Sequence, residues 1–245
     1  MRQFGLIGYP LSHSFSEKYF TEKFAKEGLN DCTYSAYPIA SIAGLSSLLK
    51  SNPLLSGLNV TIPYKEQVLA FLYGQSEVVQ QIHACNCIKV ENGKLIGYNT
   101  DVTGFESSLK KQLTTHHQQA LILGTGGAAK AVEYVLSKSG IRYKYVSRTA
   151  SDQNISYEQL TPGLIAESKL IINTTPSGMY PDIKTCPPIP YESITPHHYL
   201  FDLVYNPAKT LFLQKGEERG ALIKNGMEML VIQAEESWRI WNEVN

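Results

Sequence analysis

The sequence predicts an α/β protein built from two lobes. Short β-like runs alternate with amphipathic helical patterns along the whole chain, and this alternation is typical of the class. In the second half a glycine-rich turn, "LGTGGAAKA" (123–131), joins an apolar run to a helical pattern. The length of 245 residues is enough for two modest domains, each with its own core.

The first lobe is expected to cover residues 1–101, with strands and helices in alternation. Strands are predicted at "QFGLIG" (3–8), "CTYSAYPI" (32–39) and "SGLNVTI" (56–62), and helices at "SFSEKYFTEKFAKEG" (14–28), "SIAGLSSLLK" (41–50) and "KEQVLAFLYG" (65–74). A hairpin follows, in which "ACNCIKV" (84–90) and "LIGYN" (95–99) flank Asn92-Gly93, a dipeptide typical of a type I′ turn.

The second lobe is expected to cover residues 102–225. A helix is predicted at "FESSLKKQL" (105–113), then a strand, the glycine turn and a helix within residues 120–140, and further strands at "YKYVSR" (143–148), "KLIINTT" (169–175), "YLFDLVY" (199–205) and "ALI" (221–223). The last helix, "MEMLVIQAEESWRIW" (227–241), carries its apolar residues at helical spacing.

The glycine turn predicts a dinucleotide site. Gly124 permits a tight turn, Gly126 lets a pyrophosphate approach the backbone, and the small Ala129 keeps helix and strand close. The N–H groups at the start of the helix then face the phosphates. A βα turn that is merely tight and a methyltransferase loop are the alternatives.

The end of the next strand bears on the choice of cofactor. An NAD site usually ends this strand with Asp or Glu, which bind the ribose hydroxyls. Here the strand ends in Ser147-Arg148-Thr149, and a guanidinium beside hydroxyls suits the 2′-phosphate of NADP. The sequence therefore favours NADP, with NAD possible. A solvated arginine at a strand end is the alternative.

Four polar stretches of the first lobe stand at strand ends or loop starts, where ligands of open α/β sheets bind: "GYPLSHSFS" (8–16), "NVTIPYKE" (59–66), "ACNC" (84–87) and "GYNTD" (97–101). Lys65 is unusual, because a first helical turn disfavours a cation. A lysine near a carboxylate such as Asp101 can donate a proton to a developing alkoxide. Capping and strand-end roles are the alternatives, including a capping box at Ser14 and Glu17.

Composition excludes several classes of protein. Lys+Arg and Asp+Glu both number 22, which argues against a broad nucleic-acid surface. No apolar run reaches membrane-spanning length, and the start of the chain lacks a signal-peptide pattern. Cys85 and Cys87 lack the spacing of a zinc site and are expected as apolar fillers on one face of a strand. The sequence thus predicts a cytoplasmic enzyme with reduced thiols and no metal.

Taken in order, these motifs resemble one family, the shikimate dehydrogenases. "GYPLSHSFS", "NVTIPYKE", "GYNTDVTG", "GTGGAAKA", "INTTPSGM", "DLVYNPAKT" and "NGMEMLVIQA" match its signatures over nearly the whole chain. The resemblance implies an oxidoreductase of chorismate and aromatic amino acid biosynthesis that reversibly reduces 3-dehydroshikimate with NADPH. It also implies a Rossmann-type doubly wound dinucleotide-binding domain, and a C-terminal helix (226–245) that returns to complete the first, substrate-binding lobe.

The resemblance further implies roles for individual residues. Lys65 is expected to be the catalytic acid/base, with Asp101 as its partner. The substrate is expected to bind Ser14, Ser16, Thr61, Asn86, Tyr205 and Gln233. The cofactor is expected to bind Gly124, Thr125, Gly126, Gly127, Ala128, Ser147, Arg148, Thr149, Thr174, Leu203, Gly226 and Met229. The partner is a small molecule, and the chain is expected to be a monomer or homodimer.

Two rival functions stay open at this point. A quinate/shikimate-type paralogue that uses NAD shares the same motifs. A non-catalytic sensor that binds a nucleotide and a polyhydroxy acid belongs to another class, and the presence of both Lys65 and Asp101 argues against it.

Overall fold

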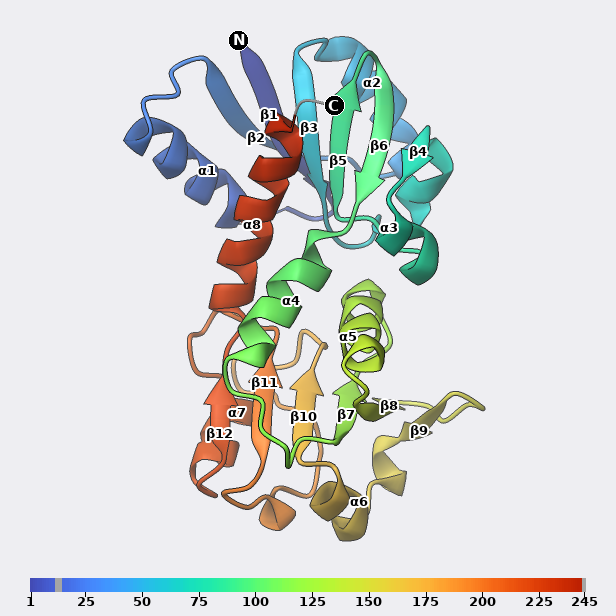
Figure 1. Ribbon diagram of the computed structural model, residues 1–245, viewed down its shortest axis with the longest axis vertical. Helices are drawn as coiled ribbons and strands as arrows, with labels where there is room; N and C mark the ends of the chain where they lie inside the picture. Colours follow the sequence, from blue (N-terminus) through green and yellow to red (C-terminus); the bar gives the residue numbers. More distant parts are fainter. Residues whose placement is uncertain (12–14, 244–245) are drawn as a thin grey trace. The chain divides into compact units, whose positions relative to one another are not determined.

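The computed structural model describes residues 1–11 and 15–243, which form two compact units. The first unit contains the chain up to Thr100 and again from Ala234 onward, and the second contains Asp101–Gln233. Each unit holds a six-stranded sheet with helices packed on it (Figure 1). The predicted α/β class is therefore confirmed.

The sheet of the first unit has the strand order β2-β1-β3-β5-β6-β4. Its strands are β1 (Arg2–Gly8), β2 (Cys32–Pro38), β3 (Leu55–Val60), β4 (Gly74–Gln75), β5 (Cys87–Glu91) and β6 (Lys94–Tyr98). Its own helices are α1 (Phe15–Lys26), α2 (Leu45–Ser51) and α3 (Glu77–Ile82). Strands β1, β2 and β3 run parallel, so their carboxyl ends lie at one edge, whereas β5 runs antiparallel to β3 and β6.

The hairpin between β5 and β6 has the predicted turn. Glu91 pairs with Lys94, which leaves Asn92 and Gly93 as a two-residue loop. Both have positive φ, 51° and 74°, as a type I′ turn requires. The turn fixes the register of the two strands, which pairs Cys87 with Tyr98, and the N–H of the preceding Asn86 donates to the Tyr98 carbonyl at 3.2 Å.

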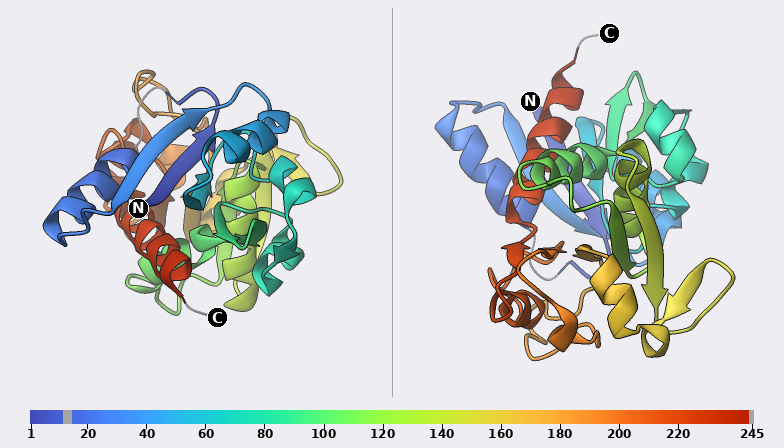
Figure 2. Two further views of the ribbon diagram at one scale, coloured as in Figure 1. Left: turned by 90° about the horizontal axis from the view of Figure 1, so that it is seen from above. Right: turned by 60° about the horizontal axis from the view of Figure 1, so that its bottom comes forward.

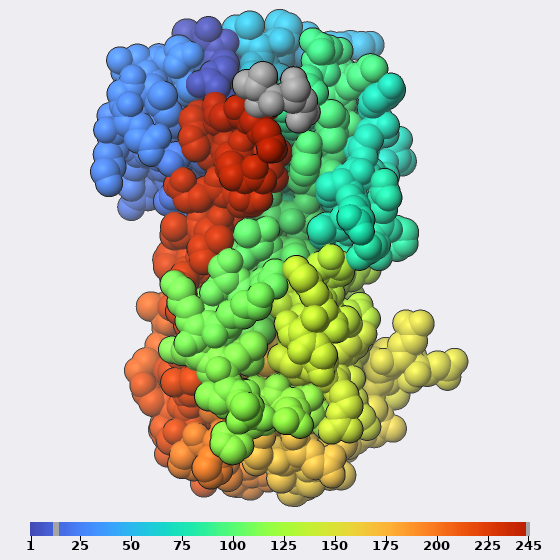
Figure 3. Space-filling view, viewed as in Figure 1, coloured from blue at the N-terminus to red at the C-terminus, as the bar shows by residue number. Residues whose placement is uncertain are grey.

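The final helix, α8 (Met227–Asn242), begins in the second unit and ends in the first, so the predicted return is confirmed. The Trp241 indole N–H donates to the Ile88 carbonyl at 3.0 Å, and its ring stacks on Phe4 at 4.9 Å. Gly57 makes room for this ring, because a Cβ there would lie 2.4 Å from the indole nitrogen. Glu235 binds Lys23 of α1, and the end of α8 lies beside α1 (Figure 3).

The sheet of the second unit is entirely parallel, in the order β12-β11-β10-β7-β8-β9. Its strands are β7 (Gln119–Leu123), β8 (Arg142–Ser147), β9 (Asn154–Ser156), β10 (Leu170–Asn173), β11 (Tyr199–Asp202) and β12 (Leu222–Lys224). Its helices, besides the start of α8, are α4 (Thr100–Lys110), α5 (Gly127–Lys138), α6 (Pro162–Glu167) and α7 (Leu211–Glu217). The chain order reverses between β7 and β10, and ligands of doubly wound sheets bind at such a switch point.

Several predictions about local structure were wrong. The helix expected over 65–74 is only a 3-10 helix, Gln67–Phe71, and Lys65 precedes it. The Lys65 carbonyl accepts from the Cys85 N–H at 2.8 Å, so the Leu69 N–H bonds to Glu66 instead. The short elements β4, α3, β9, α6 and α7 were not predicted. No helix among the described residues is long and apolar enough to span a membrane.

The two central cysteines do not share a face as predicted. Cys85 packs with Ile7 and Leu58, whereas Cys87 packs with Phe4 and Trp241 in a different cluster. The reason is that Cys85 lies before the start of β5, so the alternation of faces along the strand does not extend to it. Neither cysteine is in a disulfide, both thiols are fully buried, and burial raises the pKa of Cys87.

A buried carboxylate organises the chain after β11. Asp202 accepts hydrogen bonds from the Val204 N–H (3.0 Å), the Asn173 amide (3.0 Å) and the Thr210 hydroxyl (2.5 Å). Burial nevertheless raises its pKa from 3.8 to about 6. Because the folded-state pKa is raised, this group stabilises the fold fully below pH of about 3.9 and loses that contribution as the pH rises through about 6.

We expect Thr210→Val to lower the free energy of unfolding by about 2–3 kcal/mol at pH 7.5. The change removes a hydrogen bond to the ionised carboxylate and the N-cap of α7, whose Leu213 N–H donates to the Thr210 hydroxyl. The loss should be smaller at pH 5, where Asp202 is protonated. Urea unfolding at the two pH values measures both numbers. An equal loss at both would show that Asp202 ionisation plays no part.

Candidate functional site

In the first unit, polar residues gather at the edge where the parallel strands end. The Thr61 N–H donates to the Ile7 carbonyl at 2.9 Å, so the chain after β3 crosses the end of β1. Gly8 permits this crossing, because a Cβ there would lie 2.5 Å from the Thr61 side chain. Thr61 is half-buried at this edge.

Lys65 stands on backbone that is fixed on both sides. Before it, the Tyr64 N–H donates to the Thr61 carbonyl at 2.9 Å. The Tyr64 ring is buried, and its hydroxyl donates to the Ile39 carbonyl. At Lys65 itself, the carbonyl is held by Cys85. The side chain is half-buried. The predicted catalytic lysine is therefore adjacent to the loop that carries Asn86.

Asn86 is buried and binds Thr100. Its Oδ1 accepts from the Thr100 N–H at 2.7 Å, and its Nδ2 donates to the Thr100 hydroxyl at 3.0 Å. Asn86 thereby fixes the start of α4, and the buried Asp101 is the next residue along the chain. The contact with Thr100 uses one Nδ2 hydrogen of Asn86 and leaves the second for another partner.

A buried polar chain supports these residues, and sequence reasoning missed it. The Tyr34 hydroxyl donates to Asn59 Oδ1 (2.9 Å), Asn59 Nδ2 donates to Ser237 Oγ (2.9 Å), and Ser237 Oγ lies 3.3 Å from the Thr100 hydroxyl. Asn59 and Thr100 fall inside quoted motifs. Tyr34 and Ser237 gave no signal, because nothing in the sequence pairs β2 with α8.

Two predicted substrate residues, Ser14 and Ser16, fall near the beginning of α1 in the sequence. Ser16 is buried on α1, and its proximity to Tyr34 partly offsets the effect of burial in raising the pKa of that tyrosine. Ser14 lies outside the described residues. The interaction with Tyr34 connects Ser16 to the buried polar chain below the site.

In the second unit, the glycine turn follows β7 as predicted. Gly124 has φ +106°, and its N–H donates to the Val146 carbonyl at 2.8 Å. A Cβ at Gly124 would lie 2.7 Å from the Thr174 hydroxyl, which itself donates to the Leu123 carbonyl at 2.7 Å. The structure thus brings the predicted Gly124 and Thr174 into contact, with Thr125 between the two glycines of the turn.

The start of α5 suits a phosphate group. Gly126 is the N-cap and offers no side chain to the first N–H groups of the helix, at Gly127 and Ala128. A Cβ at Gly126 would meet no atom within 4 Å, so the space beside this residue is open. Ala129 is fully buried, and its small side chain lets α5 lie close to the sheet. These residues fit the pyrophosphate of a dinucleotide.

The predicted Ser147 ends β8, and the loop that follows carries Arg148 and Thr149 and extends from the body of its unit (Figure 2). The Ser147 hydroxyl donates to the Thr149 carbonyl at 2.6 Å and accepts from Asn154 Nδ2 at 2.7 Å, so it braces the loop. Arg148 is exposed, and its charge opposes the effect of burial on the pKa of Tyr157. The guanidinium is thus exposed at the start of the loop.

The remaining predicted cofactor residues form two contacts. A Cβ at Gly226 would lie 2.1 Å from the Leu203 carbonyl, so only glycine allows this approach. A Cβ at Gly104 would lie 2.6 Å from the carbonyl of Met229, whose side chain is buried. The first approach packs Gly226 against Leu203, and the second packs Gly104 against the first turn of α8.

Tyr205 and Gln233, predicted to bind the substrate, both belong to the second unit. Tyr205 is half-buried three residues after β11, and burial raises its pKa. Gln233 is buried on α8, and its Nε2 donates to the Leu230 carbonyl at 3.0 Å. The residues that the structure describes contain no group of three or more His, Cys, Asp or Glu able to hold a metal ion.

Comparison with known proteins points to one family. Residues 6–88 match the model of the shikimate dehydrogenase substrate binding domain. The NADP(+) shikimate dehydrogenase of Clostridium beijerinckii is 39% identical over 99% of this chain and 93% of its own. The Thermus thermophilus shikimate 5-dehydrogenase, solved with NADP(H) and shikimate, is 30% identical with a TM-score of 0.88, covering 100% of this chain and 94% of its own.

A second solved structure differs in its cofactor. The Listeria monocytogenes shikimate 5-dehydrogenase, solved with shikimate and NAD, is 28% identical with a TM-score of 0.86. The match covers 98% of this chain and 91% of the other. The same fold is therefore found with either nicotinamide cofactor.

Proposed function

This chain belongs to the shikimate dehydrogenase family, and from that premise we propose how its residues carry out the reaction. The activity is the reversible NADPH-dependent reduction of 3-dehydroshikimate to shikimate, in the biosynthesis of aromatic amino acids. The cofactor is NADP. The residue roles below are the proposal.

Lys65 is proposed as the acid/base. Bound NADPH supplies a hydride to the C3 ketone, and the ketone oxygen becomes an alkoxide. The Lys65 ammonium stabilises and protonates this oxygen, and in the oxidation its amine takes the hydroxyl proton. Asp101 is proposed as the carboxylate that orients the ammonium. The fixed backbone around Lys65 supports this role, because acid/base catalysis depends on a held geometry.

The substrate is proposed to bind through neutral donors and acceptors. Ser14 and Ser16 are assigned to its carboxylate, and Thr61, Asn86, Tyr205 and Gln233 to its ring hydroxyls or the surrounding surface. The buried polar chain from Tyr34 to Thr100 supports these assignments, since it holds Asn86 through Thr100 and places Tyr34 near Ser16. A site so braced loses little freedom when the ligand binds.

The cofactor is proposed to bind the second unit. The turn from Gly124 to Ala128 is assigned to the pyrophosphate, and Ser147 to Thr149 to the adenosine phosphate. Thr174, Leu203, Gly226 and Met229 are assigned to the nicotinamide side. The observation that carries the proposal is the uncapped start of α5 behind an open Gly126.

The decisive experiment measures reduced nicotinamide formed from shikimate or quinate with NADP or NAD. Shikimate with NADP should give the highest kcat/KM of the four pairs. A preference for quinate or for NAD would favour the quinate/shikimate paralogue. No turnover with any pair, together with binding of both ligands, would favour the non-catalytic sensor.

Arg148→Gln tests the proposed grip on the 2′-phosphate. The change removes a charge-assisted contact, so kcat/KM for NADPH should fall by about 10-fold or more, while that for NADH should not fall. Initial rates with each cofactor give the ratio. Arg219→Gln, at another exposed arginine of the second unit, is the control. An equal fall of kcat/KM with both cofactors would show that Arg148 does not bind the 2′-phosphate.

We further propose that the enzyme works in the cytoplasm as a monomer or homodimer, without a nucleic-acid or membrane partner. Cysteines that are not in disulfides and the balanced charge support this assignment. Size-exclusion chromatography with light scattering measures the assembly state.

A further inference from the structure

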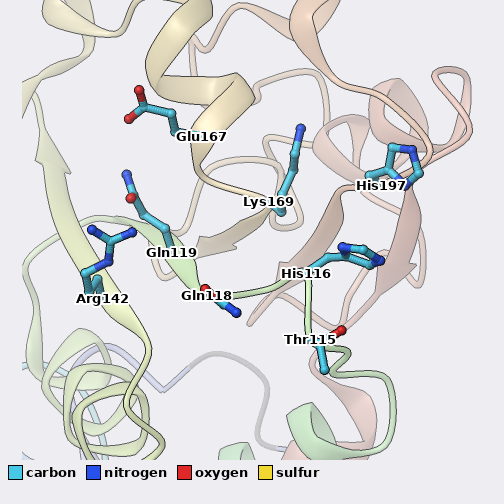
Figure 4. Close-up of a pocket in the computed structure, with 8 residues that line it drawn as sticks. All are labelled: Thr115, His116, Gln118, Gln119, Arg142, Glu167, Lys169 and His197. Carbon is cyan, nitrogen blue, oxygen red and sulfur yellow. The ribbon is translucent and has the colours of Figure 1, made fainter.

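A hollow of about 480 Å3 lies in the second unit at the edge of the sheet where the strands begin. This edge is opposite to the glycine turn, which follows the carboxyl end of β7. The hollow is lined by Thr115, His116, Gln118, Gln119, Arg142, Glu167, Lys169 and His197 (Figure 4). Its volume falls in the range of small-molecule sites, about 300–1,000 Å3. None of these residues has a role in the proposed reaction.

Two turns of the same sequence pattern, Thr-x-His-His, build one side of the hollow. In each, the N–H of the threonine donates to Nδ1 of the second histidine at 3.0 Å: Thr114 to His117, and Thr195 to His198. Burial lowers the pKa of both second histidines, so they remain neutral anchors. Nε2 of His198 lies 2.9 Å from the Ile165 carbonyl and donates to it, because Nδ1 is the acceptor.

The first histidine of each turn is exposed instead. The His116 and His197 rings lie 6.0 Å apart, centroid to centroid. In each turn the N–H of this histidine donates to the threonine hydroxyl at 3.4 Å. The repeated turn therefore fixes the backbone of both exposed imidazoles and presents them together at the hollow.

Lys169 and Arg142 extend the exposed histidines into a row of basic side chains. The strands β11, β10, β7 and β8 are consecutive neighbours in the sheet. His197, Lys169, Gln119 and Arg142 stand at or just before the starts of these four strands, in that order. Figure 4 shows Lys169 between the histidine pair and the Arg142–Gln119 pair. With neighbouring strands about 4.8 Å apart, the row extends over about 14 Å.

Charge balance indicates the class of ligand. Arg142 and Lys169 form no ion pair with any residue that the structure describes, and Glu167 is the only carboxylate of the lining. Imidazole, ammonium and guanidinium N–H groups all bind oxyanions, and guanidinium does so bidentately. A single small anion cannot contact a row of this length. A ligand with two or more anionic groups can.

We propose that this hollow binds a small multivalent oxyanion, either an oligophosphate or a polycarboxylate. The proposal is independent of the dehydrogenase reaction, since it rests on the opposite edge of the sheet. A competing explanation is electrostatic support alone, because basic residues near helix C-termini stabilise the helix dipole. That explanation predicts a loss of stability on neutralising the row but no binding.

The test uses the full chain and two probes, tripolyphosphate and citrate. Proton NMR follows the imidazole signals during titration, and the His116→Asn and His197→Asn variants assign them. We expect the His116 and His197 signals to move and those of the buried His117 and His198 to stay, with a dissociation constant below about 1 mM for one probe. The probe that binds more tightly identifies the ligand class.

The double variant Arg142→Gln/Lys169→Gln should weaken this binding by about tenfold or more. The control Lys184→Gln/Arg219→Gln removes the same charge from exposed positions of the same unit, and it should leave the affinity unchanged. The proposal is overturned if neither probe moves the two histidine signals, including the case in which Zn2+ moves them and the anions do not. It is also overturned if both double variants weaken binding equally. Shikimate oxidation should be unaffected by either double variant.

Discussion

Lys65→Ala is expected to lower kcat/KM for shikimate by about 100- to 10,000-fold, the range that general acid/base catalysis contributes. The reason is that no other group would then accept the hydroxyl proton as the hydride leaves. Cofactor affinity should change little, because Lys65 and the glycine turn belong to different units. Initial rates give the first quantity, and quenching or enhancement of NADPH fluorescence on titration gives the second.

The matched control for Lys65 is Lys50→Ala. Lys50 is an exposed lysine in the last turn of α2 in the same unit, so its removal tests the loss of one positive charge alone. It should keep normal kcat/KM. Near-normal turnover of Lys65→Ala would show that another group transfers the proton. A lost activity with lost NADPH affinity would instead indicate a folding defect.

Gly126→Ala is expected to weaken NADPH binding by about tenfold or more with an unchanged melting temperature. A Cβ at this position meets no protein atom within 4 Å, and the backbone there (φ −80°, ψ −179°) suits any residue. The added methyl group would therefore displace only a ligand that approaches the backbone closely. Calorimetric titration with NADPH and thermal unfolding measure the two effects.

Gly124→Ala, two residues earlier, is the contrasting variant. Its φ of +106° and the 2.7 Å approach of the Thr174 hydroxyl make any side chain costly to the fold itself. We expect this variant to lower the melting temperature as well as the affinity. If Gly126→Ala kept the NADPH affinity of the unchanged chain, the pyrophosphate could not lie at this turn.

Much of the fold followed from the sequence. Two signals act locally: the alternation of apolar residues in a strand, and turn residues such as Asn92-Gly93. For this reason the strands β1, β3, β7, β8 and β10 were predicted to within two or three residues. The short elements were missed because a helix of one or two turns leaves little periodic signal. The helix expected after Lys65 failed for a different reason, since its first carbonyl binds Cys85, 20 positions later.

The sequence by itself determined the class of the fold, the family and the identity of the residues proposed to react, because ordered motifs and turn chemistry are local properties of the chain. Only the tertiary structure decided which groups support them. The buried path from Tyr34 through Asn59 and Ser237 to Thr100 contains a hydrogen bond between residues 178 positions apart, Asn59 and Ser237. The row from His197 to Arg142 likewise exists only because four strands from separate parts of the chain begin side by side. Hydrogen bonding and charge depend on distance in space, and that distance is set by strand pairing and packing.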